Sequence, residues 1–211
     1  MKNLNRKKQV QFCLTGSLMI GLGVAVCRSG QIGVDPFNAM CIGISGQLGI
    51  GLGTVFMVCQ VLLLVFVIFL NKSYIGLGTI INGVFLGWLV DGITAVLRYM
   101  FPLLKNPVIG VRIFCMVIGI LVLTLGISLY FTGDLGIAPY DAVGKILMER
   151  ANFSYAVSRV LTDGFSAIIA FLFKGPIGIG TIVITCFSGP LVQIWNKKIS
   201  EPLFHKGERD V

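Results

Sequence analysis

Apolar residues run along the chain in long blocks that are separated by short polar stretches. Six blocks are long enough to cross a bilayer, for which a helix needs ~20 apolar residues. They cover residues 9–28, 54–71, 76–97, 109–131, 156–173 and 177–196. The fifth block is the most polar, because it begins near Arg159 and contains Asp163. The pattern predicts an all-α integral membrane protein with six transmembrane helices.

The same Gly-rich, Pro-centred phrase interrupts the hydrophobic pattern twice. GQIGVDPFNA covers residues 30–39, GDLGIAPYDA covers 133–142, and four of the ten positions are identical. A second pair of similar segments is IGLGTIINGVFLGWLV at 75–90 and IGIGTIVITCFSGPLV at 177–192, in which nine of sixteen positions are identical. We therefore predict an internal duplication within a single membrane domain over 1–211. Repeat 1 covers 11–97, repeat 2 covers 114–196, and 197–211 form a short tail.

Each predicted repeat contains three spans, so the second repeat enters the membrane from the side opposite to the first. Repeats of this kind are inverted and are related by a pseudo-two-fold axis in the membrane plane. Many secondary transporters are built in this way and bind their substrate near the midplane, where the repeats meet. Some channels share the symmetry, so the symmetry alone does not choose between them.

Each repeated phrase predicts a short helix after the first span of its repeat. Pro is favoured in the first turn of a helix, and Asp is a good N-cap. The helices are expected to begin at Pro36 and Pro139, each preceded by flexible backbone at Gly33 or Gly136. They are too short to span, so they either lie at the interface or dip into the membrane as re-entrant helices.

Polar residues at the predicted helix starts and at repeat-related positions within the spans are the candidate substrate-binding residues. They are Asp35, Asn38, Asp141, Gln60 and Asp163. An acid inside a span is costly and is a functional candidate by default. The alternatives are that Asp35 and Asp141 only cap helices at the interface, and that Asp163 pairs with Arg159 one helical turn earlier.

Composition and charge agree with a membrane protein. Hydrophobic residues make up 55% of the chain and charged residues 12%, and the mean hydropathy is +0.91. With the N-terminus inside, twelve of the 17 Lys and Arg residues lie on the cytoplasmic side, so both termini are predicted to be cytoplasmic. The basic N-terminus and its apolar run indicate an uncleaved first span. The net charge of +8 therefore reflects membrane orientation and does not indicate nucleic-acid binding.

No metal site, cofactor or catalytic centre is predicted. The six Cys residues are scattered through apolar runs and are expected to be small buried hydrophobes. The single His205 lies in the polar tail, and no nucleophile–base pair or nucleotide motif is present. The repeated Gly-x-Gly-Thr at Gly76–Thr79 and Gly178–Thr181 is interpreted as close packing, because it lacks the Lys of a phosphate-binding loop.

These motifs resemble those of the bacterial YczE/YyaS/YitT group of multi-pass membrane proteins. The resemblance rests on Gly-x-Gly-x-x-Pro-aromatic-acid/amide after span one and on Gly-x-Gly-Thr at span three, and it covers about residues 11 to 196. In that group the position after Pro and its aromatic residue is usually Asp, which Asp141 matches and Asn38 does not. The resemblance implies a bacterial cell-membrane protein and names no substrate.

We expect a small secondary transporter or permease for a small polar or anionic metabolite. A passive channel, the substrate-capturing subunit of a vitamin importer, and a non-transporting scaffold or accessory protein are the alternatives. An enzyme is the least favoured class. The expected partners are the lipid bilayer and an unidentified solute, and a homodimer is compatible with the sequence.

Overall fold

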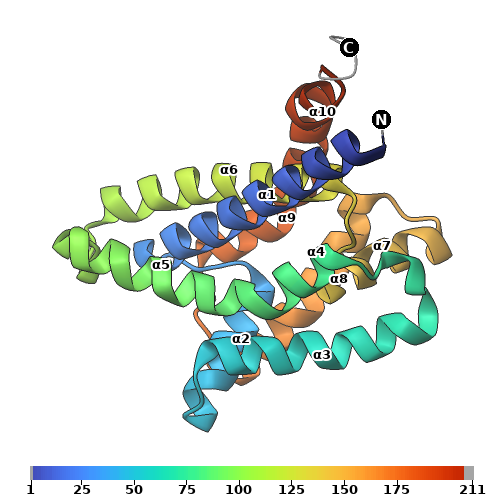
Figure 1. Cartoon of the computed structure of the whole chain (residues 1–211). Coiled ribbons are helices and arrows are strands. Elements are labelled where there is room, and N and C mark those ends of the chain that lie inside the picture. Colours follow the sequence, from blue (N-terminus) through green and yellow to red (C-terminus); the bar gives the residue numbers. More distant parts are fainter. Residues whose placement is uncertain (1, 207–211) are drawn as a thin grey trace.

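The computed structural model describes residues 2–206, with side chains described for residues 6–205, and the described chain is helical (Figure 1). The elements in chain order are α1 (Lys2–Gly30), α2 (Pro36–Leu48), α3 (Leu52–Leu70), η1 (Lys72–Tyr74), α4 (Leu77–Ile80), η2 (Ile81–Phe85), α5 (Leu86–Met100), η3 (Pro102–Lys105), α6 (Ile109–Gly133), α7 (Pro139–Ala151), α8 (Tyr155–Leu172), α9 (Ile179–Trp195), η4 (Asn196–Ser200) and α10 (Glu201–Lys206).

Six of these helical segments are apolar and long enough to cross a membrane, as the hydrophobic pattern predicts. They are Arg6–Gly30, Leu52–Leu70, Leu77–Met100, Ile109–Gly133, Tyr155–Leu172 and Ile179–His205. The third segment joins α4, η2 and α5, and the sixth joins α9, η4 and α10. The predicted tail therefore begins as a continuation of the last helix, while residues 207–211 lie outside the described residues.

Antiparallel packing of α1 against α6 forms the centre of the bundle (Figure 1). Glycines seven residues apart make this crossing close. A Cβ on Gly16 would lie 2.8 Å from the carbonyl oxygen of Gly126, and a Cβ on Gly23 would lie 2.8 Å from that of Gly119. Small residues let membrane helices approach in this way, so these glycines account for part of the high Gly content.

The segment that follows each of these two helices packs against the start of a span in the other half. The backbone N–H of Gly78 donates to the carbonyl of Leu135 at 2.7 Å, and that of Gly180 donates to the carbonyl of Ile32 at 3.1 Å. The two Gly-x-Gly-Thr motifs are thus close-packing elements. Their Thr side chains bond the local backbone, with Gly76 N–H donating to Thr79 Oγ1 at 3.0 Å.

Gly33 and Gly136 are required by this crossed arrangement. Their φ angles are +121° and +96°, which L side chains rarely adopt. A Cβ on Gly33 would also lie 2.6 Å from Thr181 Oγ1, and one on Gly136 would lie 2.9 Å from Thr79 Oγ1. The same backbone geometry thus recurs at equivalent points of the two predicted repeats.

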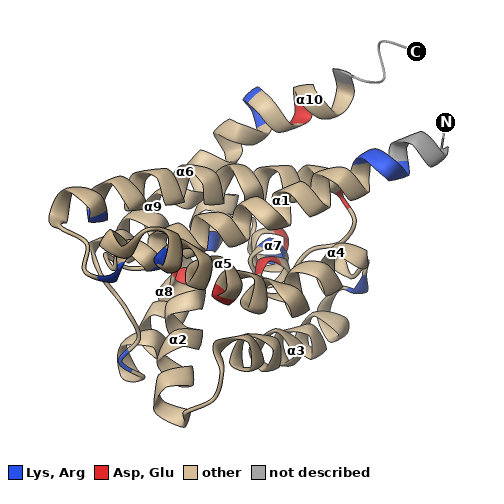
Figure 2. Ribbon diagram, turned by 60° about the vertical axis from the view of Figure 1, so that its left-hand side comes forward, with Lys and Arg blue, Asp and Glu red and all other residues tan. Residues whose placement is uncertain are grey.

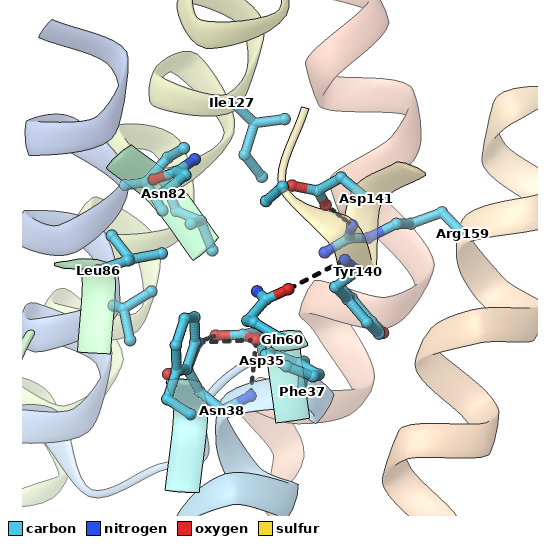
Figure 3. A pocket seen from close by; sticks show the side chains of 15 residues that line it. Asp35, Phe37, Asn38, Gln60, Asn82, Leu86, Ile127, Tyr140, Asp141 and Arg159 are labelled. Atoms are coloured by element: carbon cyan, nitrogen blue, oxygen red, sulfur yellow. Dashed lines mark hydrogen bonds and ion pairs between the residues drawn. The ribbon is translucent and has the colours of Figure 1, made fainter. Parts of the chain in front are cut away.

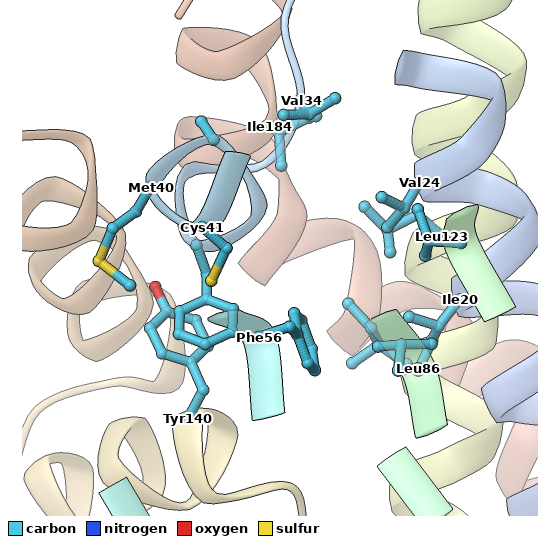
Figure 4. Close-up of a cluster of buried hydrophobic side chains, with 14 of the residues drawn as sticks. Ile20, Val24, Val34, Met40, Cys41, Phe56, Leu86, Leu123, Tyr140 and Ile184 are labelled. Atoms are coloured by element: carbon cyan, nitrogen blue, oxygen red, sulfur yellow. The ribbon is translucent and has the colours of Figure 1, made fainter. Parts of the chain in front are cut away.

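The short helices α2 and α7 begin beside each other in the interior. The rings of Phe37 and Tyr140 stack with centroids 4.3 Å apart, one residue into each helix. Phe56, in the first half of α3, packs edge-on against Phe37 at 5.2 Å. A buried apolar cluster surrounds this contact, with Ile20 of α1 and Leu86 of α5 on its other side (Figure 4).

Both ends of the described chain lie at one end of the bundle (Figure 1). Phe204 of α10 packs edge-on against Phe12 of α1 with centroids 5.2 Å apart. Lys8 donates a hydrogen bond to the Phe204 carbonyl and lies over its ring. The last helix is thereby anchored to the first.

Candidate functional site

A buried cavity of about 50 Å³ lies where α2 and α7 begin (Figure 3). Residues of both halves line it, and apolar side chains of α1 and α6 close one side. The lining residues are Ile20, Val24, Asp35, Phe37, Asn38, Phe56, Gln60, Asn82, Leu86, Leu123, Ile127, Ala138, Tyr140, Asp141 and Arg159. Acidic and basic positions lie together at α7, in the interior of the bundle (Figure 2).

Asp35 caps the start of α2, as its position before Pro36 predicts. Its carboxylate accepts the backbone N–H of Asn38 at 3.1 Å, which occupies one of the free amides at the helix start. The side-chain amide of Asn38 also donates to both carboxylate oxygens, at 3.2 and 3.0 Å. The two residues therefore form one buried polar unit.

Arg159 joins two acids that the sequence separates. Its guanidinium lies 2.5 Å from Asp141 Oδ1 and 3.2 Å from Asp163 Oδ2. The ion pair of Asp163 with Arg159, which was the alternative to a substrate-binding role for this acid, is present, and Arg159 also binds Asp141 on α7. All three side chains are at least 88% buried, so the cluster ties α7 to α8 in the interior of the protein.

Tyr140 connects this cluster to the first half. Its hydroxyl donates to Asp163 Oδ1 at 2.6 Å, and its backbone N–H donates to Gln60 Oε1 at 3.1 Å. Ser166 adds a hydrogen bond to the same hydroxyl at 3.3 Å. Gln60 and Asp163, which the predicted duplication places at equivalent positions, thus bind the same residue. The expected helix partner of the mid-span Gln60 is α7.

Two amide oxygens at the cavity have no hydrogen-bond partner among the described residues. They are Oδ1 of Asn38 and Oδ1 of Asn82, whose residues are only 4% and 1% exposed. Asn82 lies in the π-helical turn η2, a geometry that often marks functional sites. Leaving a buried acceptor unpaired costs about 1–3 kcal/mol, so both oxygens suit a bound donor or cation.

The surroundings of Asp35 raise the pKa of its carboxyl group above the value in water. Burial raises the pKa of this carboxyl from 3.8 to about 6, although the N–H of Asn38 opposes the shift. The negative charge of Asp163 raises the pKa further, and the positive charge of Arg159 lowers it. Asp35 therefore titrates close to neutral pH.

A second, apolar groove of about 620 Å³ lies on the other face of the Phe37–Tyr140 stack. It runs between α3 and α8, and its walls include exposed Phe66 and Phe165. Since these walls belong to apolar spans, the groove faces lipid in a membrane. The aromatic pair thus separates the polar cavity from the lipid-facing surface.

The structure brings four of the five candidate residues to the cavity wall. Asp35, Asn38, Asp141 and Gln60 line it, while Asp163 lies directly behind, bound to Arg159 and Tyr140. Pro36 and Pro139 begin their helices as predicted.

Sequence reasoning did not assign three residues to the site: Asn82, Tyr140 and Arg159. Asn82 was visible as an amide within an apolar span. Arg159 was considered only as an ion-pair partner of Asp163. Asp91 lies away from the cavity and pairs with Arg28 at 2.5 Å.

Comparison with known proteins places the chain in a family. Residues 7–197 match the model described as "Family of unknown function (DUF6198)", and the chain therefore belongs to that family. It is 28% identical over 199 residues to "Uncharacterized protein YyaS" of Bacillus subtilis, covering 92% of this chain and 95% of the relative. It is also 22% identical over 186 residues to "Uncharacterized membrane protein YczE" of the same organism, covering 86% and 82%. The resemblance to the YczE/YyaS group is thereby confirmed, and no solved structure matches significantly.

Proposed function

We propose that this member of the DUF6198 family is a secondary transporter for a small polar solute. One observation carries the proposal. Two Pro-started helices from different halves begin against each other, and their first residues line a buried polar cavity with unpaired acceptors. Secondary transporters place their sites at such interrupted helices near the bilayer midplane.

The level at which α2 and α7 begin supports re-entrant helices. Tyr140 N–H binds Gln60, which is close to the middle of the 19-residue α3. Asp163, the partner of the Tyr140 hydroxyl, is close to the middle of the 18-residue α8. A helix that starts at mid-span and ends after 13 residues, or ~20 Å at 1.5 Å per residue, reaches only one membrane surface.

The proposed inverted repeat gives this site a way to open alternately to each side. The antiparallel α1–α6 pair, the crossed loops and the positive φ angles at Gly33 and Gly136 are repeat-related features that support it. Arg159 binds α7 to α8 within the second half, whereas the Phe37–Tyr140 stack joins the halves. Rocking of one half against the other would therefore have to change that stack together with the other contacts between the halves, of which the α1–α6 packing is the most extensive.

The charges at the cavity favour a polar solute over an anionic one. The start of α2 is already occupied by the Asp35 carboxylate, so its free amides are less available to an anion. The guanidinium of Arg159 is bound by two acids. An anion would have to displace one of them.

We place the protein in the bacterial cell membrane with both termini cytoplasmic. The contact between Phe12 and Phe204 supports the same side for both, and the distribution of Lys and Arg selects the cytoplasm. A passive channel and a non-transporting scaffold are the competing functions, and an enzyme is not proposed. A homodimer is compatible with this arrangement.

A thermal-shift screen of the detergent-purified protein tests the site. A solute that binds only the folded protein raises its stability by RT ln(1 + [L]/Kd). We expect a dose-dependent rise in Tm with at least one small polar solute. The rise should be lost in Asn82→Leu and kept in Asn106→Leu, which makes the same change at an exposed position. A folded protein that no solute stabilises would favour the scaffold.

A further inference from the structure

The cavity wall carries one acid without a positive partner. Asp141 is neutralised by Arg159, which Asp163 also binds. Asp35 makes no ion pair within the described residues, and its hydrogen bonds come from the neutral amide and backbone of Asn38. The single positive charge of Arg159 faces two carboxylates, so this cluster is already net negative, and ionised Asp35 adds a further negative charge at the cavity.

One unpaired oxygen belongs to Asn38, which contacts this acid, and the other belongs to Asn82, on the facing wall of the cavity. The side-chain amide nitrogen of Asn38 donates to both oxygens of Asp35, which fixes the orientation of the amide and leaves its Oδ1 without a donor. Asn82 Oδ1 lacks a partner as well, and both side chains line the cavity (Figure 3). The Asp35 carboxylate and the side-chain oxygens of Asn38 and Asn82 are all hydrogen-bond acceptors. The three side chains therefore line one small cavity with acceptor oxygens.

We infer that this cavity binds a small monovalent cation at Asp35 and Asn38, with Asn82 on the facing wall. The inference rests on the proposed function, because the ion would serve the transporter as its coupling ion or its cargo. A space of about 50 Å³ holds only a few water-sized species, since one water needs ~10–15 Å³ on this measure, and so limits the ion's size. Divalent ions favour several charged or water ligands, whereas this wall offers one unpaired carboxylate.

Alkali ions and ammonium groups share the ability to bind to such oxygens. They differ in that an alkali ion is held by oxygen ligands alone, whereas ammonium donates N–H bonds of fixed direction. The experiment therefore includes Li⁺, Na⁺, K⁺, ammonium and methylammonium chlorides. N-methylglucamine chloride at equal ionic strength serves as the large cation that the cavity excludes.

The measurement is the Tm of the detergent-purified full-length protein in each salt. We expect at least one small cation to raise Tm in a saturable way over N-methylglucamine. Asp35→Asn should remove the rise, whereas Asp91→Asn should keep it, because Asp91 pairs with Arg28 away from the cavity. Equal Tm values in all salts, or an unchanged rise in Asp35→Asn, would overturn the cation site.

Asn82→Asp tests the site if Asp35→Asn does not fold. Adding a carboxylate at the cavity should lower the cation Kd by at least threefold, which a purely structural role of Asn82 does not predict. An unchanged or weaker cation response in folded Asn82→Asp would contradict the inference. Solute stabilisation without any cation effect would overturn this site and leave the proposed transport function standing. A cation effect without solute binding would support the site and remove the solute function.

Discussion

Replacing Arg159 by Met tests whether the buried carboxylates of Asp141 and Asp163 destabilise the protein once their cation is removed. The substitution leaves the carboxylates of Asp141 and Asp163 without their cation, although both are largely or fully buried. Removing one partner of a buried ion pair costs ~3–5 kcal/mol. At ~2–4 °C per kcal/mol for a chain of this size, Tm should fall by roughly 6–20 °C.

Arg28→Met is the matched control. Arg28 lies 2.5 Å from Asp91, the same distance as Arg159 from Asp141, but these side chains are 25% and 39% exposed. Solvent screening reduces an exposed pair to ~0–1 kcal/mol, so Tm should fall by less than about 4 °C. The two pairs share the substitution and the 2.5 Å distance, and they differ in burial and in the second carboxylate that Arg159 binds.

The assay is thermal unfolding in detergent, and its readout is the fraction of protein that remains monodisperse after heating. The triple variant Arg159→Met, Asp141→Asn, Asp163→Asn should recover most of the loss, because it leaves no unpaired charge. Equal losses for Arg159→Met and Arg28→Met would refute the argument from burial. A triple variant no better than Arg159→Met would show that the guanidinium acts through packing.

Two further predictions concern the start of α2. Gly33→Ala should abolish or strongly reduce the folded yield, because the φ of +121° is strained for Ala and the new Cβ would lie 2.6 Å from Thr181 Oγ1. Gly46→Ala should be tolerated, because a Cβ there meets no neighbouring atom within 4 Å. Equal yields of the two variants in membranes would contradict this. The folded protein holds the Asp35 proton up to about pH 6 and the unfolded chain only to about 4. Stability should therefore fall between pH 4 and 6, by up to ~3 kcal/mol relative to Asp35→Asn. Parallel Tm–pH curves for the two proteins would disprove that shift.

The spans were predictable because a bilayer demands long apolar helices. The predicted fourth span, 109–131, differs from α6 (Ile109–Gly133) by two residues at one end. The π-helical turn at Ile81–Phe85 was not predictable, since an apolar run shows no sign of a changed hydrogen-bond register.

The local contacts of the site were also predictable, and the long-range ones were not. Asp35 caps its own helix, and Arg159 and Asp163 are one turn apart on α8, so short spacing indicates both contacts. The bond from Arg159 to Asp141 joins two helices, and hydropathy does not show which faces of them meet. Asn82 escaped the comparison of repeats because its equivalent, Ile184, is apolar.

Counterflow in proteoliposomes tests the central claim most directly. Vesicles loaded with the stabilising solute from the thermal-shift screen are diluted into a trace of the labelled compound. Transient accumulation of label is predicted for the wild type and for Asn106→Leu, and none for Asn82→Leu. A solute that binds the wild type but never accumulates, or that accumulates equally through Asn82→Leu, would contradict transport through this cavity.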